Sequence, residues 1–149
     1  MVARPAHTWW RTVTDSDSVP RVNTTAEGKV YPDLAFEVST ERVAAFRAVF
    51  GEKRDVVPPT FLTAAEFAAF PAVIADPDLA LDFARVVHGE QEYEWRRPLR
   101  VGETLTARSR IASAKVRGSL GFLTIETELR DESDEKVAVC RATMIERGE

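Results

Sequence analysis

PPTFLTAAEFAAF, residues 58–70, is the stretch around which the rest of the chain is organised. Its two leading prolines suit a first helical turn, where no N–H partner is lost, and strong helix formers follow. The polar residues of the stretch stand three positions apart: Thr60, Thr63 and Glu66. A helix that is apolar nearly all round is buried against other elements, and this one is too short to cross a bilayer. The stretch therefore predicts a buried central helix over about residues 59–70, ended by Pro71.

From Val87 onward the apolar period changes to two, which indicates β-strands. Around residues 90–95 an aromatic face alternates with an acidic one. Longer strands are expected over residues 103–116, 120–129 and 136–145.

Turns at Gly118 and near residues 133–134 set these long strands in one consistent register. Opposite charges then face each other on one side and apolar residues on the other: Arg110 with Glu126, Arg108 with Glu128, Ile111 with Ile125, Glu126 with Arg141, Ile125 with Ala142 and Leu123 with Met144. A slip by one residue would destroy both agreements. The pattern predicts an α+β protein with the hot-dog arrangement, in which a curved antiparallel sheet wraps a long central helix.

Shorter elements precede the central helix and follow it. Residues 34–38 are a strand candidate, and a helix is expected between a cap at Ser39 or Thr40 and Gly51. After Asp76-Pro77, the helical spacing of Leu79, Phe83 and Val86 predicts a short helix with one apolar face.

Length and composition describe a single domain of 149 residues, with 44% hydrophobic and 30% charged residues. Residues 1–27 have polar, turn-forming composition and predict a flexible arm, whose Trp9 and Trp10 dock on the body, while residues 28–149 form the domain. A net charge of −4 argues against nucleic-acid binding. The lone Cys140 excludes an internal disulfide and, with no apolar leader, predicts a cytoplasmic protein that binds no membrane.

Three motifs in order resemble the MaoC-like hot-dog family, in particular the N-terminal-type dehydratase domain of the actinobacterial HadA/HadC kind. They are GKVY (residues 28–31), VPPTF (residues 57–61) and HGEQEYEWRRPLRVGE (residues 88–103), and the likeness spans roughly residues 28–147. The resemblance implies a hot-dog fold and work on (3R)-hydroxyacyl thioesters of acyl carrier protein or CoA. It also implies paired hot dogs, in which one subunit supplies catalysis and a HadA-like one holds the acyl chain.

The catalytic members of that family carry an Asp-x-Asn-x-x-His-like segment between the first helix and the central one. Here the interval is GEKRDVV, residues 51–57, without Asn or His, and the whole chain has only His7 and His88. Elimination of water needs both a base and an acid. The resemblance therefore implies a non-catalytic, substrate-holding subunit of a heteromeric dehydratase in fatty-acid or polyketide biosynthesis, with a MaoC-like catalytic partner.

Assembly is expected through the strand edge at residues 91–95, because a lone hot dog leaves that edge open. Glu90, Glu92 and Glu94 would repel their own copies there unless arginines intervene, so a partner with basic residues is favoured. A homodimer is the fallback when that partner is absent.

Two residues are candidates for catalysis. His88 and Glu90 stand two apart and could form an acid–base pair, or His88 could order the strand start by hydrogen bonding. Glu66 is a lone carboxylate on an apolar helix, which is costly to bury unless it is paired or functional. It could serve an acyl-thioesterase, or it could face solvent or a partner and bond an arginine. A third possibility is a scaffold that binds acyl thioesters without catalysis.

Binding residues are expected on the central helix and the aromatic strand. Those assigned to substrate are Thr60, Phe61, Glu66, Phe67, Tyr93 and Trp95. Those assigned to an acidic carrier protein or CoA phosphates are Arg96, Arg97, Arg100, Lys115 and Arg117. The helix N-terminus could hold a thioester oxygen, although its prolines leave only the N–H groups of Thr60 and Phe61. Neither a metal nor a cofactor is expected.

Overall fold

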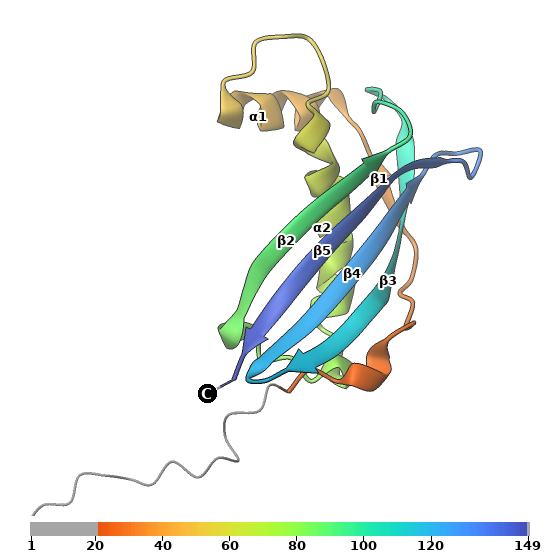
Figure 1. Ribbon diagram of the computed structural model, residues 1–149. Helices are drawn as coiled ribbons and strands as arrows, with labels where there is room; N and C mark the ends of the chain where they lie inside the picture. The colour runs from red at the N-terminus through yellow and green to blue at the C-terminus, as the bar shows by residue number, and fades with distance from the viewer. Residues whose placement is uncertain (1–20, 149) are drawn as a thin grey trace, which may run out of the picture.

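The computed structural model describes residues 21–148 (Figure 1). Its helices are α1 (Thr40–Phe50) and α2 (Leu62–Ile74), with short 3₁₀ turns η1 (Thr24–Ala26), η2 (Pro59–Phe61), η3 (Pro77–Leu79) and η4 (Phe83–Arg85). Its strands are β1 (Leu34–Glu37), β2 (Val86–Trp95), β3 (Thr104–Arg117), β4 (Leu120–Arg130) and β5 (Lys136–Arg147).

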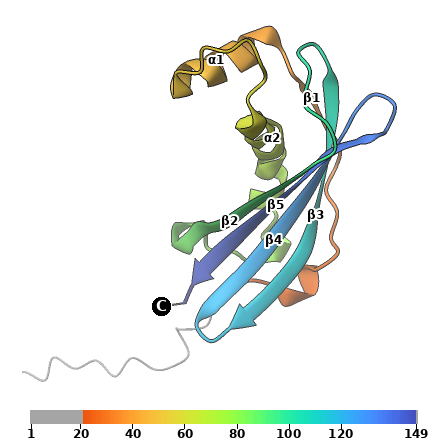
Figure 2. The same ribbon diagram turned by 45° about the horizontal axis from the view of Figure 1, so that its top comes forward.

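The five strands form one antiparallel sheet in the order β1-β3-β4-β5-β2. Figures 1 and 2 show the sheet curving along α2, with α1 near the N-terminal end of that helix. The predicted class is confirmed: this is the α+β hot-dog arrangement. No helix within residues 21–148 is long and apolar enough to span a bilayer.

The register expected from charge and apolar matching is confirmed in both hairpins. Every expected pair is present: Arg110 with Glu126, Arg108 with Glu128, Ile111 with Ile125, Glu126 with Arg141, Ile125 with Ala142 and Leu123 with Met144. Arg110 Nη2 lies 2.6 Å from Glu126 Oε1, whereas the Arg108 guanidinium pairs with Asp33 and Asp134.

The core lies between α2 and the sheet, and α2 contributes to both of its apolar clusters. Near its start, Leu62 and Ala65 pack with residues of β1, β3, β4 and β5. Near its end, Phe70 and Val73 pack with Ile111 and other residues of the hairpins. This shared packing fixes the helix against the sheet and sets the faces on which the candidate site is built.

The central helix differs from its prediction in two respects. It does not end at Pro71 but continues to Ile74, because Pro71 lies on the exposed side while the buried Val73 extends the core contact. It is also not wrapped all round. Phe61 and Phe70 are buried as expected, but Phe67 is 41% exposed, so one flank of α2 is open.

The segment after α2 is not the single short helix that the spacing predicted. It forms two separate three-residue turns, η3 and η4, because Ala80 adopts a left-handed conformation with φ 53° between them. Leu79 is buried as expected, but Phe83 is 39% exposed.

The packed body begins before residue 28. Val22 and Ala26 are buried, and the Glu146 carboxylate accepts hydrogen bonds from the N–H groups of Arg21 (2.7 Å), Val22 (2.9 Å) and Asp82 (3.0 Å). The last turns of the arm are therefore held by the end of β5. Residues 1–20, with Trp9 and Trp10, lie outside the described residues.

Candidate functional site

A polar cluster lies between the open flank of α2 and the inner face of β2. The three-residue spacing of Thr63 and Glu66 puts both on one side of the helix, and the alternation of β2 turns Gln91 and Tyr93 toward them. Gln91 Nε2 donates to both Glu66 oxygens, at 3.0 and 3.2 Å, and lies 3.3 Å from the Arg141 carbonyl oxygen. The Thr63 and Tyr93 hydroxyls share a hydrogen bond.

Glu66 is fully buried, and its partner is a neutral amide, not the arginine considered from the sequence. Burial raises the pKa of its carboxyl from 4.5 to about 7, although the Gln91 hydrogen bond opposes the shift. Burial also raises the pKa of the nearby Cys140 thiol, as is typical of an unreactive buried cysteine. Glu66 therefore holds a proton over part of the neutral pH range, away from solvent.

His88 lies at the solvent-exposed start of β2. A β-bulge between His88 and Glu90 breaks the alternation on which their pairing was based. The His88 Nε2 atom lies 3.0 Å from the Glu90 backbone oxygen, and the ring centre is 6.0 Å from that of Phe67. The imidazole thus contacts the main chain and an aromatic ring, and the described bonds do not join it to the Glu90 carboxylate.

A pocket of about 410 Å³ opens beside the N-terminal end of α2. Its lining comes from the α1–α2 link and the end of β2 with the loop that follows: Val57, Pro58, Pro59, Trp95, Arg96, Arg97, Pro98 and Leu99. The Phe61 N–H, one of the two groups expected to hold a thioester oxygen, donates to the Pro58 carbonyl at 2.9 Å. One of the two expected donors is thus already satisfied, and the pocket is an apolar slot with a basic rim.

A second groove, of about 660 Å³, lies on the other flank of α2. Residues of β1, α1 and α2 line it: Leu34, Ala35, Phe36, Arg42, Ala45, Phe46, Val49, Phe61, Ala64 and Ala68. Of the residues expected to contact substrate, Trp95 thus reaches the first pocket and Phe61 the second. Thr60 and Phe67 are exposed, whereas Glu66 and Tyr93 belong to the polar cluster.

The expected docking residues are not brought together. Arg96, Arg97 and Arg100 follow β2, whereas Lys115 and Arg117 lie at the far end of the sheet, as the pairs Trp95 with Ala138 and Arg117 with Leu120 require. Arg97 is also engaged, with its Nη2 atom 2.8 Å from Glu103 and 3.0 Å from Asp131.

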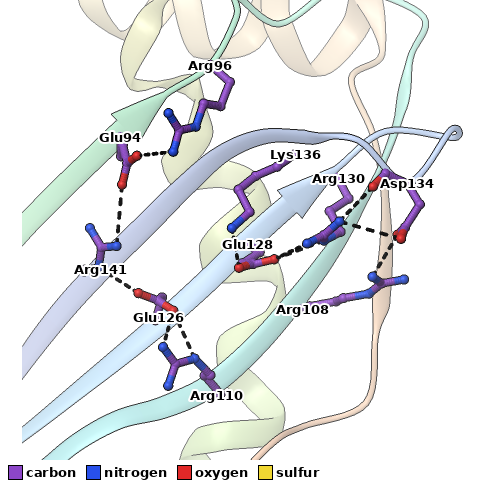
Figure 3. A network of polar contacts seen from close by, with 10 residues as sticks. All are labelled: Glu94, Arg96, Arg108, Arg110, Glu126, Glu128, Arg130, Asp134, Lys136 and Arg141. Carbon is purple, nitrogen blue, oxygen red and sulfur yellow. Dashed lines mark hydrogen bonds and ion pairs between the residues drawn. The ribbon is translucent and has the colours of Figure 1, made fainter.

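The outer face of the sheet carries a chain of ion pairs that crosses four strands (Figure 3). Glu126 of β4 lies 2.6 Å from Arg110 of β3 and 2.7 Å from Arg141 of β5. Arg141 also reaches two carboxylates of β2, Glu92 at 3.1 Å and Glu94 at 3.6 Å. The register predicted the Arg110–Glu126–Arg141 part of this chain. Its extension to β2 was missed because the β2–β5 pairing is long-range.

Comparison with solved structures supports the hot-dog fold. The HadBC (3R)-hydroxyacyl-ACP dehydratase complex of Mycobacterium tuberculosis superposes with a TM-score of 0.65 at 20% identity, covering 80% of this chain and 96% of that one. A MaoC-like dehydratase gives 0.69 at 16% identity over 83% of this chain and 42% of its own. The R-hydratase PhaJ1 of Pseudomonas aeruginosa gives 0.58 at 15% identity, covering 88% and 89%. At these identities the likeness establishes the fold alone.

Fold and sequence comparison together define the class, a hot-dog domain of the dehydratase type. Residues 35–140 match the model of the FAS1-like dehydratase domain region, and the chain belongs to that family. UPF0336 proteins are similar along most of their length. The one from Streptomyces coelicolor is 34% identical over 137 residues, covering 80% of this chain and 91% of the relative. The one from Saccharopolyspora erythraea is 31% identical over 138 residues, covering 81% and 88%.

Proposed function

We propose that this protein is the non-catalytic, substrate-holding subunit of a heteromeric (3R)-hydroxyacyl-thioester dehydratase. Its partner is a MaoC-like hot-dog subunit that carries the Asp/His pair, and its substrates are acyl groups on acyl carrier protein or CoA in fatty-acid or polyketide biosynthesis. The cytoplasm, where the unpaired thiol of Cys140 stays reduced, is the setting we infer.

The placement of the candidate acid and base carries this proposal. Elimination needs two proton-transfer groups within reach of one reacting unit. Among residues 21–148, Glu66 is closed off behind Gln91 and His88 lies exposed on the bulge of β2. Neither group lines the pocket beside α2. Groups so placed suit a subunit that shapes the site and leaves proton transfer to its partner.

The two hollows beside α2 support the holding role. The pocket at its N-terminal end is mainly apolar, which suits a pantetheine arm. Its two rim arginines already form ion pairs within the chain, Arg96 with Glu94 and Arg97 with acidic residues of the neighbouring loops. The groove on the other flank is lined by apolar side chains except for Arg42, which suits an acyl chain. Both volumes fall within the range of small-molecule sites, about 300–1,000 Å³.

Hydration of crotonyl-CoA, the reverse reaction, tests the division of labour. We expect background rates from the pure chain and full activity when a MaoC-like partner is co-purified with it. Replacing the partner's Asp or His should abolish that activity, whereas Glu66→Gln in this chain should leave turnover largely intact. Robust hydration by the pure chain, lost in His88→Ala, would contradict the proposal.

A second candidate is an acyl-thioesterase that uses Glu66 as a general base. The pKa of about 7 favours it, because general bases work best when their pKa lies near the working pH. Hydrolysis of acyl-CoA by the pure chain, abolished by Glu66→Gln, would establish it. Thioester binding without either activity, with or without a partner, would instead indicate a scaffold.

A further inference from the structure

Strand β2 is an open edge of the sheet. It pairs with β5 on one side, and no strand within residues 21–148 pairs with its other side. Such an edge is normally covered, blunted or paired with another chain. Large apolar side chains beside it are also exposed: Phe67 by 41%, Val87 by 45% and Trp95 by 36%. An edge flanked by exposed apolar groups has the composition of an interface.

The outward residues of this edge form an incompletely neutralised acidic row. Glu94 lies 2.5 Å from Arg96. Among the described residues, Glu92 pairs only with Arg141, and Arg141 also pairs with Glu94 and Glu126. Glu90 has no ion pair with any residue from 21 to 148. The ion-pair chain of Figure 3 alternates from cationic β3 to anionic β4, cationic β5 and anionic β2, so a following strand continues it only if that strand is cationic.

Pairing with a second copy of this chain sets this acidic row against itself. Two antiparallel copies must set outward residues opposite outward residues, because a one-residue shift sends every side chain to the other face. In every two-fold register centred on a residue from 90 to 94, at least one glutamate of the row then faces a glutamate of the other copy. Like charges directly opposite are destabilising.

We propose that β2 selects a non-identical hot-dog subunit whose edge strand presents arginine or lysine opposite Glu90 and Glu92. This rests on the proposed function only in taking the partner to be a hot-dog subunit. The acidic row acts as the specificity determinant: it completes ion pairs with the partner and opposes self-association.

Glu90→Lys tests the proposal in the protein alone. Because Glu90 has no ion pair to lose within the described residues, the substitution changes the edge while leaving the intramolecular network intact. In the register centred on residue 91, the introduced lysine of each copy would face Glu92 of the other, so the row becomes self-complementary. In the register centred on residue 92, it would face Glu94, while Glu92 would still face its own copy. Glu132→Lys, at an exposed position in the β4–β5 turn, carries the same change in net charge away from the edge and is the matched control.

Sedimentation velocity across a concentration series, with circular dichroism to check folding, is the measurement. At low salt we expect Glu90→Lys to tighten the homodimer roughly tenfold relative to wild type, because two symmetric contacts change from repulsive to attractive. The gain should shrink at high salt, and Glu132→Lys should behave as wild type. Glu90→Gln only removes repulsion, so it should tighten the homodimer by roughly threefold. If the lysine variant misfolds, this variant provides the test.

A Glu90 variant that associates no more tightly than Glu132→Lys would overturn the proposal. That result would mean either that the edge is not an interface or that its charge does not select the partner. The assay uses no substrate and no dehydratase partner. A negative sedimentation result therefore does not affect the proposed dehydratase function. A negative crotonyl-CoA result, in turn, does not affect the proposed role of the acidic row.

Discussion

Glu66 occupies a position where an ionised carboxylate is disfavoured. It is fully buried beside the Gln91 amide, and burial raises its pKa from 4.5 to about 7. The folded state therefore prefers the protonated form. The stability that this preference contributes is complete below pH 4.5 and is lost as pH rises through about 7.

Glu66→Gln should remove that pH dependence, because an amide fits the same site and does not ionise. As pH rises from 4.5 to 8, the variant should therefore gain about 2–3 kcal/mol of stability relative to wild type. Urea unfolding at several pH values measures the difference. Glu132→Gln, in an exposed turn, is the control and should follow wild type. Parallel pH profiles for Glu66→Gln and wild type would show that Glu66 titrates as an ordinary carboxyl.

At the scale of the element, α2 retains a proline that weakens its own helix. Pro71 lies inside the helix and cannot donate a hydrogen bond to the Phe67 carbonyl. Its ring is exposed, so it contributes little packing in return. The helix continues past it because Val73 is buried in the core on the opposite side.

Pro71→Ala should therefore stabilise the protein by about 1–2 kcal/mol, the helical gain being partly offset by the greater freedom of the unfolded chain. Thermal and urea unfolding measure the change. Pro77→Ala is the matched control: Pro77 starts η3 behind the Asp76 cap, where proline is favourable, so its loss should not stabilise. Equal effects of the two substitutions would contradict the assignment of Pro71 as a weak point of α2.

The elements that could be predicted are those over-determined by local pattern. The β3–β4–β5 register followed from two independent agreements, ion pairs such as Arg110 with Glu126 and apolar pairs such as Ile111 with Ile125. The predicted end of α2 at Pro71 was wrong. The hydrogen bond that proline removes can be read from the sequence, whereas the burial of Val73 that outweighs its loss depends on the tertiary structure. The contact between Glu66 and Gln91 was missed for the same reason: no periodicity in either element encodes how a helix rotates against an edge strand.

At the scale of the whole molecule, the pocket beside α2 gives the proposed holding role a measurable consequence. Trp95 forms one wall of this pocket and is 36% exposed. In the complex with a catalytic partner, Trp95→Ala should raise the KM for an acyl thioester about tenfold while changing kcat little, because it removes apolar contact and no proton-transfer group. Val116→Ala, a partly exposed site on β3, is the control. A fall in kcat with unchanged KM, in a complex shown intact by gel filtration, would place Trp95 in the chemistry.

The pairing of β2 with β5 also bears on how the chain reaches this structure during its synthesis. The first registered pair joins Val86 to Glu146, so β2 has no sheet partner until β5 has been made. The apolar α2 leaves the ribosome long before the three-strand meander that covers it. At about 5–20 residues per second, the nascent chain exposes that helix for several seconds. The β2–β5 side of the sheet is therefore completed last, so the part of α2 that it covers stays open to chaperones until β5 has been made.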